Sequence, residues 1–175
     1  MLQASKQVDW CLKKAKKEIE ECKRRGIRPK HRGLLKVEPN LQETKKHIEK
    51  AVHDLEVTEY LKKGDFLDMS VSTIFYSMYH CFLAISSKFG YETSNQTCTI
   101  SLIEYLNEEG KIELDKKFID MFKYQDNKEE KKDSLIEMRE DYTYSSKISF
   151  NNEKIDELIK TAKELINISK ELVFA

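Results

Sequence analysis

The hydrophobic and polar positions of this chain follow helical spacing along most of its length. The most apolar stretch runs from Phe66 to Phe89, and no Asp, Glu, Lys or Arg occurs between Asp68 and Lys88. Its apolar residues do not alternate but recur at intervals of three and four, and they occupy more than one face of a helix. A helix that is apolar all round is buried. We therefore predict that this stretch is the central helix of an all-helical domain.

A membrane span is the competing interpretation of the same stretch, because roughly 20 apolar residues cross a bilayer. Hydroxyl and imidazole side chains are scattered through it, however, and they lower the tendency to insert, while small residues suit close packing between helices. These residues are Ser70, Ser72, Thr73, Ser77, His80, Ser86 and Ser87. We therefore expect no membrane span.

Further helices are predicted by amphipathic stripes on both sides of the central helix. Asn40 is the expected N-cap of the helix before it, Gly64 is expected to end that helix, and Asp65 can cap the central helix. Asn151 or Asn152 is expected to cap the last helix, which has the clearest stripe. The charged run 126–134 is either a solvated part of a helix or a loop. The stripes lie at 8–22, 41–55, 100–106, 112–124, 135–142 and 155–172.

Composition supports the same fold class. The chain of 175 residues contains only five Gly and two Pro, and Lys, Glu, Leu and Ile dominate, which favours helices over a sheet. A chain of this length is ordinarily one domain with its own core. We therefore predict a single all-α domain without a β-sheet, built as a bundle of five or six mostly antiparallel helices.

Net charge is zero, so the whole molecule is not a polycation made for nucleic acid. The charge is nevertheless uneven, because residues 13–36 carry eleven Lys and Arg against three Glu. The segment 27–39 forms a basic loop that contains Arg28, Lys30, His31 and Arg32. It is either an arm that contacts phosphate or a solvated connection, and the second interpretation is the simpler one.

The four cysteines, Cys11, Cys22, Cys81 and Cys98, show no CxxC spacing. They indicate free thiols in a reducing compartment. The first ten residues lack an apolar targeting segment, so we expect a cytoplasmic protein.

Metal and cofactor motifs are not found in the sequence. His47 and His53 are six residues apart, on opposite sides of a predicted helix, and are interpreted as surface histidines. No P-loop, Gly-rich turn or zinc spacing occurs. We therefore expect neither a metal nor a cofactor.

Three short motifs resemble the HEPN family of helical domains. The run Ser72–His80, S-T-I-F-Y-S-M-Y-H, is similar to that family's core helix S-R-A-Y-Y-A-M-F-H, and Ser94–Ile100 resembles the polar turn that opens its next helix. Met138–Tyr142 resembles its R-x-x-A-D-Y segment, which precedes a long C-terminal helix. The resemblance covers roughly Asp65 to Leu172 and leaves the basic segment 1–39 outside.

The resemblance implies a helical bundle that forms a homodimer with a cleft at the interface. Many members are metal-independent ribonucleases or toxins, often encoded beside a minimal nucleotidyltransferase. They place a His after an Arg with four to six residues between the two: the Arg stabilises phosphate charge and the imidazole moves a proton. Here Arg139 is followed by Tyr144, Ser145 and Ser146 at the corresponding positions, and no His follows. Tyr is a poor general base at neutral pH, so ribonuclease activity is left open.

Carried over residue by residue, the resemblance makes Arg139 and Tyr144 the candidate catalytic residues. Tyr142 and Tyr144 are the candidates to receive a nucleotidyl group, and His80 and Asn95 are candidate ligand-binding residues. Each has a structural alternative. Arg139 can pair with acids at a helix end, His80 can be a hydrogen-bonded core residue, and Asn95 can cap a helix; for His80 and Asn95 the structural role is favoured.

Two functional classes follow from these observations. The first is a HEPN-type RNA-binding or nucleotide-binding protein, the toxin-like half of a module with a minimal nucleotidyltransferase. The second is a catalytically silent bundle that acts as a dimerisation or adaptor module. The missing His supports the second class, and the basic segment supports the first.

Overall fold

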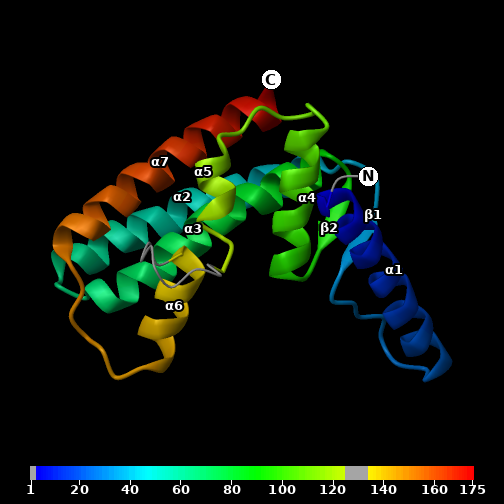
Figure 1. The fold of residues 1–175 in the computed structure, drawn as a ribbon, viewed down its shortest axis with the longest axis horizontal. Helices are drawn as coiled ribbons and strands as arrows, with labels where there is room; N and C mark the ends of the chain where they lie inside the picture. Colours follow the sequence, from blue (N-terminus) through cyan, green and yellow to red (C-terminus); the bar gives the residue numbers. More distant parts are fainter. Residues whose placement is uncertain (1–2, 125–133) are drawn as a thin grey trace. The chain divides into compact units, whose positions relative to one another are not determined.

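The computed structural model describes residues 3–124 and 134–175, and within these ranges the chain is mainly helical (Figure 1). The all-α fold is therefore confirmed. The helices number seven rather than five or six, because the stretches at 112–124 and 135–142 give separate short helices. They are α1 (Gln3–Arg24), α2 (Leu41–Lys63), α3 (Leu67–Lys88), α4 (Gln96–Glu108), α5 (Lys116–Asp120), α6 (Leu135–Tyr144) and α7 (Asn152–Phe174).

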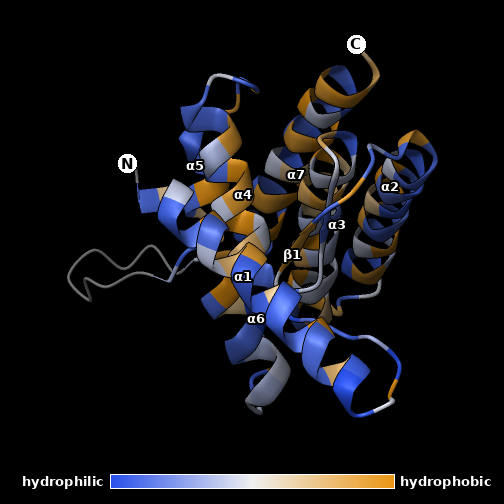
Figure 2. Ribbon diagram, turned by 90° about the vertical axis from the view of Figure 1, so that its right-hand side faces the viewer, coloured by the Kyte–Doolittle hydropathy of each residue, from blue (hydrophilic) through white to orange (hydrophobic). Residues whose placement is uncertain are grey.

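The described chain forms two compact units. Unit 1 comprises residues 1–45 and 82–113, and unit 2 comprises residues 46–81 and 114–175. The long helices α2 and α3 each contribute residues to both. In Figure 2, α2 and α7 show hydrophobic and hydrophilic residues around the same helix, as expected for helices that bury one face.

Unit 1 contains a small sheet that the sequence analysis did not predict. Strand β1 (Leu34–Lys36) pairs antiparallel with β2 (Tyr91–Thr93), with Leu34 opposite Thr93 and Lys36 opposite Tyr91. Each strand has three residues, which is too short for an alternating pattern to stand out. The expectation of no sheet was therefore wrong. In unit 1, α1 packs against α4 and β1.

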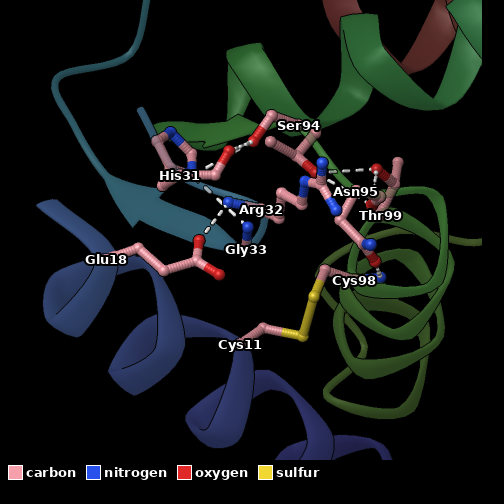
Figure 3. The surroundings of a disulfide bond; sticks show 10 residues. Cys11, Glu18, His31, Arg32, Gly33, Ser94, Asn95, Cys98 and Thr99 are labelled. Carbon is pink, nitrogen blue, oxygen red and sulfur yellow. Dashed lines mark hydrogen bonds between the residues drawn. A yellow bond between two sulfur atoms is a disulfide. The ribbon is translucent and has the colours of Figure 1, made fainter. Parts of the chain in front are cut away.

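A disulfide joins α1 to α4 in unit 1 (Figure 3). It links Cys11 and Cys98, which are both fully buried, while Cys22 and Cys81 are free. The prediction of four free thiols was wrong. The partners are 87 residues apart in sequence, so no local spacing could reveal the pair.

In unit 2, the backbones of α2 and α3 approach closely through small polar residues. The Ser77 hydroxyl on α3 donates to the Ala51 carbonyl on α2 at 2.7 Å, and the hydroxyls of Thr58 and Thr73 lie 2.7 Å apart. Buried hydroxyls need such partners. The hydroxyl side chains inside α3, the most apolar helix, thus serve its packing against α2. No helix in the described ranges is long and apolar enough to span a membrane.

Side-chain caps begin the helices where the sequence predicted them. The Asn40 side chain accepts from the Glu43 N–H at 3.0 Å at the start of α2, and Asn151 accepts from the N–H groups of Glu153 and Lys154 at the start of α7. Asp65 has a different role from the predicted one. It adopts a left-handed conformation with φ 63° at the end of α2, which Asp tolerates better than most residues.

The final helix buries its predicted stripe. Its buried residues include Ile155, Leu158, Ile159, Ala162, Leu165, Ile166 and Ser169. Ion pairs connect its polar side to α2, between Lys163 and Glu59 and between Asp156 and Lys62. The later residue on α2, Lys62, pairs with the earlier residue on α7, Asp156. The helices α2 and α7 are therefore antiparallel. The charged run 126–134 lies outside the described residues except for Ser134, which caps α6.

Candidate functional site

Arg139 lies in the middle of α6, five residues before its last residue. The helix begins with a capping box, in which Ser134 and Glu137 bond each other's backbone N–H groups. The helix continues to Tyr144, so Arg139 does not lie in its last turn. The sequence had suggested a position at the helix end. An interaction with the helix dipole is therefore a weaker explanation for this residue, since the effect fades beyond the terminal turn.

The Arg139 guanidinium rests on an aromatic ring. Its central carbon lies 4.5 Å from the centre of the Phe75 ring, and the side chain is 18% exposed. Nη2 donates to Glu140 Oε1 at 3.4 Å, which is long for a charge-assisted bond. The buried Nε has no acceptor among the described residues. The guanidinium therefore uses one of its five N–H donors in the described part of the chain.

Glu140 links Arg139 to a residue that the sequence analysis missed. The Tyr124 hydroxyl donates to Glu140 Oε1 at 2.7 Å, the same oxygen that contacts Arg139. This hydrogen bond, followed by burial, raises the pKa of Tyr124. Tyr124 lies 15 residues before Arg139 and belongs to none of the motifs, so its place at the site follows only from the fold.

Aromatic side chains build the surface beneath Arg139. The rings of Phe75 and Phe122 are 5.1 Å apart, and Tyr79 stacks on Phe75 at 5.9 Å. Phe75 and Phe122 are almost fully buried. The guanidinium is thus supported by a packed cluster and not by a mobile surface chain.

The two candidate tyrosines of α6 have different surroundings. The Tyr142 hydroxyl donates to the Ser149 carbonyl at 3.2 Å, and its ring meets the Phe150 ring at 4.8 Å. Tyr144 is 82% exposed. Tyr142 comes three residues after Arg139 and lies near the same side of the helix, whereas Tyr144 comes five residues after it, about 140° away. The Tyr144 hydroxyl is therefore the more accessible of the two.

His80 pairs with His47 and does not lie at Arg139. The two Nδ1 atoms are 3.0 Å apart and the ring centres 5.2 Å apart. His80 comes five residues after Phe75, so the two side chains leave α3 about 140° apart. Burial, followed by the nearby His47, lowers the pKa of His80. His47 is half-buried and bonds His80 on α3, whereas His53 is exposed as predicted.

Asn95 begins α4 in unit 1. Its Oδ1 accepts the Cys98 N–H at 3.0 Å, so the capping role favoured by the sequence is present. Its backbone oxygen accepts the Thr99 hydroxyl at 3.0 Å. A ligand contact by the Asn95 carboxamide oxygen would therefore compete with the cap.

No cluster of three or more His, Cys, Asp or Glu side chains in the described ranges is arranged to hold a metal ion. His47 and His80 form a pair only.

The family comparison agrees with the motifs. The family model for the HEPN domain matches residues 44–172, so α2 belongs to the match although it carries no short motif, and residues 1–43 lie outside it. None of the curated proteins matches the chain at a significant level. Because the family model covers well over half of the 175 residues, the chain belongs to the HEPN domain family.

Proposed function

We propose that unit 2 binds the phosphate groups of RNA or of a nucleotide at Arg139. Two facts support the proposal: HEPN domains are generally associated with RNA or nucleotides, and the buried Arg139 Nε has no acceptor among the described residues. A buried donor without an acceptor costs about 1–3 kcal/mol. A ligand oxygen that reaches this side of the guanidinium would offset that cost.

The aromatic cluster explains how Arg139 can act as a phosphate receptor. Contact with the Phe75 ring restricts the plane of the guanidinium, so little rotational freedom is lost when an anion binds. A planar guanidinium can donate two parallel hydrogen bonds to one phosphate, a geometry that Lys cannot reproduce. The bond to Glu140 is long, and Glu140 keeps its bond to Tyr124 if Arg139 turns toward a ligand.

Binding is a better match to these residues than RNA cleavage. The imidazoles of His47 and His80 bind each other, and His80 leaves α3 on a different side from Phe75. His80 therefore does not supply a proton acceptor next to Arg139.

The toxin-like module is a finer version of this proposal. In it, a minimal nucleotidyltransferase transfers a nucleotidyl group to Tyr144: the phenol oxygen bonds the α-phosphorus of a nucleoside triphosphate, pyrophosphate leaves and the phenol proton passes to solvent. The exposure of Tyr144 favours it over Tyr142, whose hydroxyl already donates to Ser149. Mass spectrometry of the protein from its native cell tests this proposal, since the added mass should be missing from Tyr144→Phe.

A dimerisation or adaptor role is the second candidate. Two residues of α3, Met69 and Tyr76, are exposed, with exposed fractions of 55% and 46%, and Phe66, the residue before the helix, is 57% exposed. Met69 and Tyr76 are seven residues apart, so they share one side of the helix. An exposed apolar stripe favours association of two copies. Light scattering of Met69→Lys and wild type tests the homodimer, because only the wild type should show the dimer mass.

Titration of labelled RNA and nucleotides tests the phosphate site. We expect Arg139→Lys to weaken binding about tenfold, the effect of losing one charge-assisted hydrogen bond, and Arg139→Met to weaken it further. Lys160→Met is the matched control, because Lys160 is an exposed cation on α7. Melting temperatures of all variants should stay close to that of the wild type.

The two candidate roles give different outcomes in this titration. If Arg139 only pairs with Glu140, Arg139→Lys should leave ligand binding unchanged and cost at most about 1 kcal/mol of stability. Wild-type protein that binds no RNA or nucleotide would overturn the proposal and favour the adaptor role.

A further inference from the structure

A pocket of about 670 Å³ lies in unit 1, where the sequence predicted a basic loop. The C-terminal half of α1, the loop 27–32 and strand β2 line it. Three cations, Arg25, Lys30 and Arg32, are among the lining residues. These cations all lie in residues 1–43, outside the segment that matches the HEPN family model.

The loop that carries Lys30 and Arg32 is held on both sides. His31 Nε2 lies 3.2 Å from Glu92 Oε1 on β2. His31 Nδ1 lies 3.1 Å from the Ser94 hydroxyl (Figure 3). The Ser94 hydroxyl also donates to the His31 carbonyl. The His31 side chain is only 7% exposed. Imidazole and hydroxyl thus anchor the loop on the β2 side.

A second set of contacts anchors the loop to α1. The Arg32 backbone N–H donates to the Glu18 carboxylate. Gly33 is buried against α1 so closely that an added Cβ would lie 2.3 Å from the Cys11 carbonyl oxygen. The disulfide of Cys11 with Cys98 ties the same turn of α1 to α4 (Figure 3). The loop is therefore a structured wall of the pocket, and its residues 27–30 and Arg32 are exposed to solvent.

The acids that line the pocket have partners in the chain. Glu18 accepts from Arg32 N–H, Glu92 faces His31, and Glu21 lies 4.0 Å from Arg24. By contrast, the side-chain cations of Arg25, Lys30 and Arg32 have no hydrogen-bond or ion-pair partner in the described ranges. Residues 13–36, which include these three cations, carry an excess of eight positive charges. Such a field attracts anions to the pocket.

We propose that this pocket binds the phosphate groups of a ligand, with Arg25, Lys30 and Arg32 as the contacting side chains. The anchored loop fixes the backbone positions from which Lys30 and Arg32 extend, which lowers the entropy cost of recognition. The volume suits a small ligand, since such pockets measure about 300–1,000 Å³. The phosphates belong either to a free nucleotide or to an RNA backbone. The site is separate from Arg139 and does not depend on the function proposed for unit 2.

Tripolyphosphate, ATP and a fluorescein-labelled 12-nucleotide RNA are the probes for a binding titration. We expect Arg25→Met, Lys30→Met and Arg32→Met each to weaken binding of tripolyphosphate about tenfold, the effect of one charge-assisted contact. Arg28→Met and Lys13→Met are matched controls, because they remove the same charge from the same basic segment and neither residue lines the pocket. These controls should change affinity less than about twofold, as expected for screened charges.

Each outcome of the titration is decisive. A loss of tripolyphosphate affinity confined to the three pocket variants supports the proposal. Tight binding of ATP with weak binding of RNA would identify a free nucleotide as the source of the phosphates. Equal loss in pocket and control variants would overturn it in favour of a diffuse basic surface. Wild-type protein that binds none of the three probes would also overturn it. If Arg139→Met loses tripolyphosphate binding while the pocket variants keep the wild-type affinity, the binding belongs to unit 2. That result would overturn the proposal of a phosphate site in the pocket.

Discussion

Nδ1 of His47 lies 3.0 Å from Nδ1 of His80, so the hydrogen bond between them requires one nitrogen with a proton and one without. The two imidazoles therefore cannot both be protonated in this arrangement. Burial lowers the pKa of His80, and so does the nearby His47. Lys50 also lowers it, while the carboxylate of Asp54 acts in the opposite direction. All three of these side chains come from α2, which packs on this side of α3.

The histidine pair should make folding stability depend on pH. Because the folded pKa of His80 lies below its ordinary value of about 6.5, the unfolded chain binds the proton more tightly. Stability should therefore be fully present above about pH 6.5 and fall as the pH drops below it toward the lowered pKa. Urea unfolding between pH 5 and 8 measures this effect.

His80→Gln should flatten that pH profile, since it removes the titrating group. His53→Gln is the control, because His53 is exposed on the same helix as His47. An equal pH dependence in wild type and His80→Gln would contradict this prediction.

The disulfide should contribute strongly to the stability of unit 1. Removal of a native disulfide from a small domain typically costs about 2–5 kcal/mol, and the present one closes a long loop. Cys11→Ser should lower the free energy of unfolding by that amount, while Cys22→Ser, a free and half-buried cysteine, should change it little. Urea unfolding with and without reductant measures the effect. A wild type that is insensitive to reductant under denaturing conditions would show that the bond is absent.

Features encoded locally were predictable from the sequence. The stripes located the long helices, and Asn40, Asn95 and Asn151 were identified as caps, because periodicity and capping depend on residues within one or two turns. The same holds for the family motifs, which lie within single helices or turns.

Features that depend on distant residues were not predictable. The disulfide joins positions 87 residues apart, and the histidine pair joins α2 to α3. The spacing of His47 and His53 on one helix gives no information about His80, the partner of His47 on α3. Tyr124 reaches Arg139 only through Glu140. Such contacts are set by tertiary packing, which a single sequence does not display.

Gly33 should tolerate no side chain. A Cβ at this position would meet the Cys11 backbone oxygen at 2.3 Å, and neither backbone can move freely beside the disulfide. Gly33→Ala should therefore destabilise the protein by about 2 kcal/mol or more, within the range of overpacked sites. In Gly64→Ala, the Cβ would lie 2.9 Å from atoms of the Phe66 ring, an exposed side chain that can turn away. A smaller loss of stability in Gly33→Ala than in Gly64→Ala would contradict this prediction.

Glu140 should act as a competitor of phosphate at Arg139. Its carboxylate contacts the guanidinium and accepts from Tyr124, so a phosphate that binds Arg139 must work against a negative charge held nearby. Glu140→Gln removes that charge and keeps the side-chain size. We expect the affinity for RNA or nucleotide to rise about three- to tenfold at low salt, and the gain to shrink as salt screens the charge.

Asp141→Asn is the matched control for this prediction. Asp141 is the next residue of α6, and its carboxylate pairs with the exposed Lys147 instead of Arg139. The two variants carry the same net charge, so a general electrostatic effect should change their affinities equally. An increase confined to Glu140→Gln would place the ligand at Arg139. Equal increases in both variants would show that Glu140 acts only through the overall charge. A loss of affinity in Glu140→Gln would show that Glu140 only positions Arg139. Either result would contradict competition between Glu140 and the ligand.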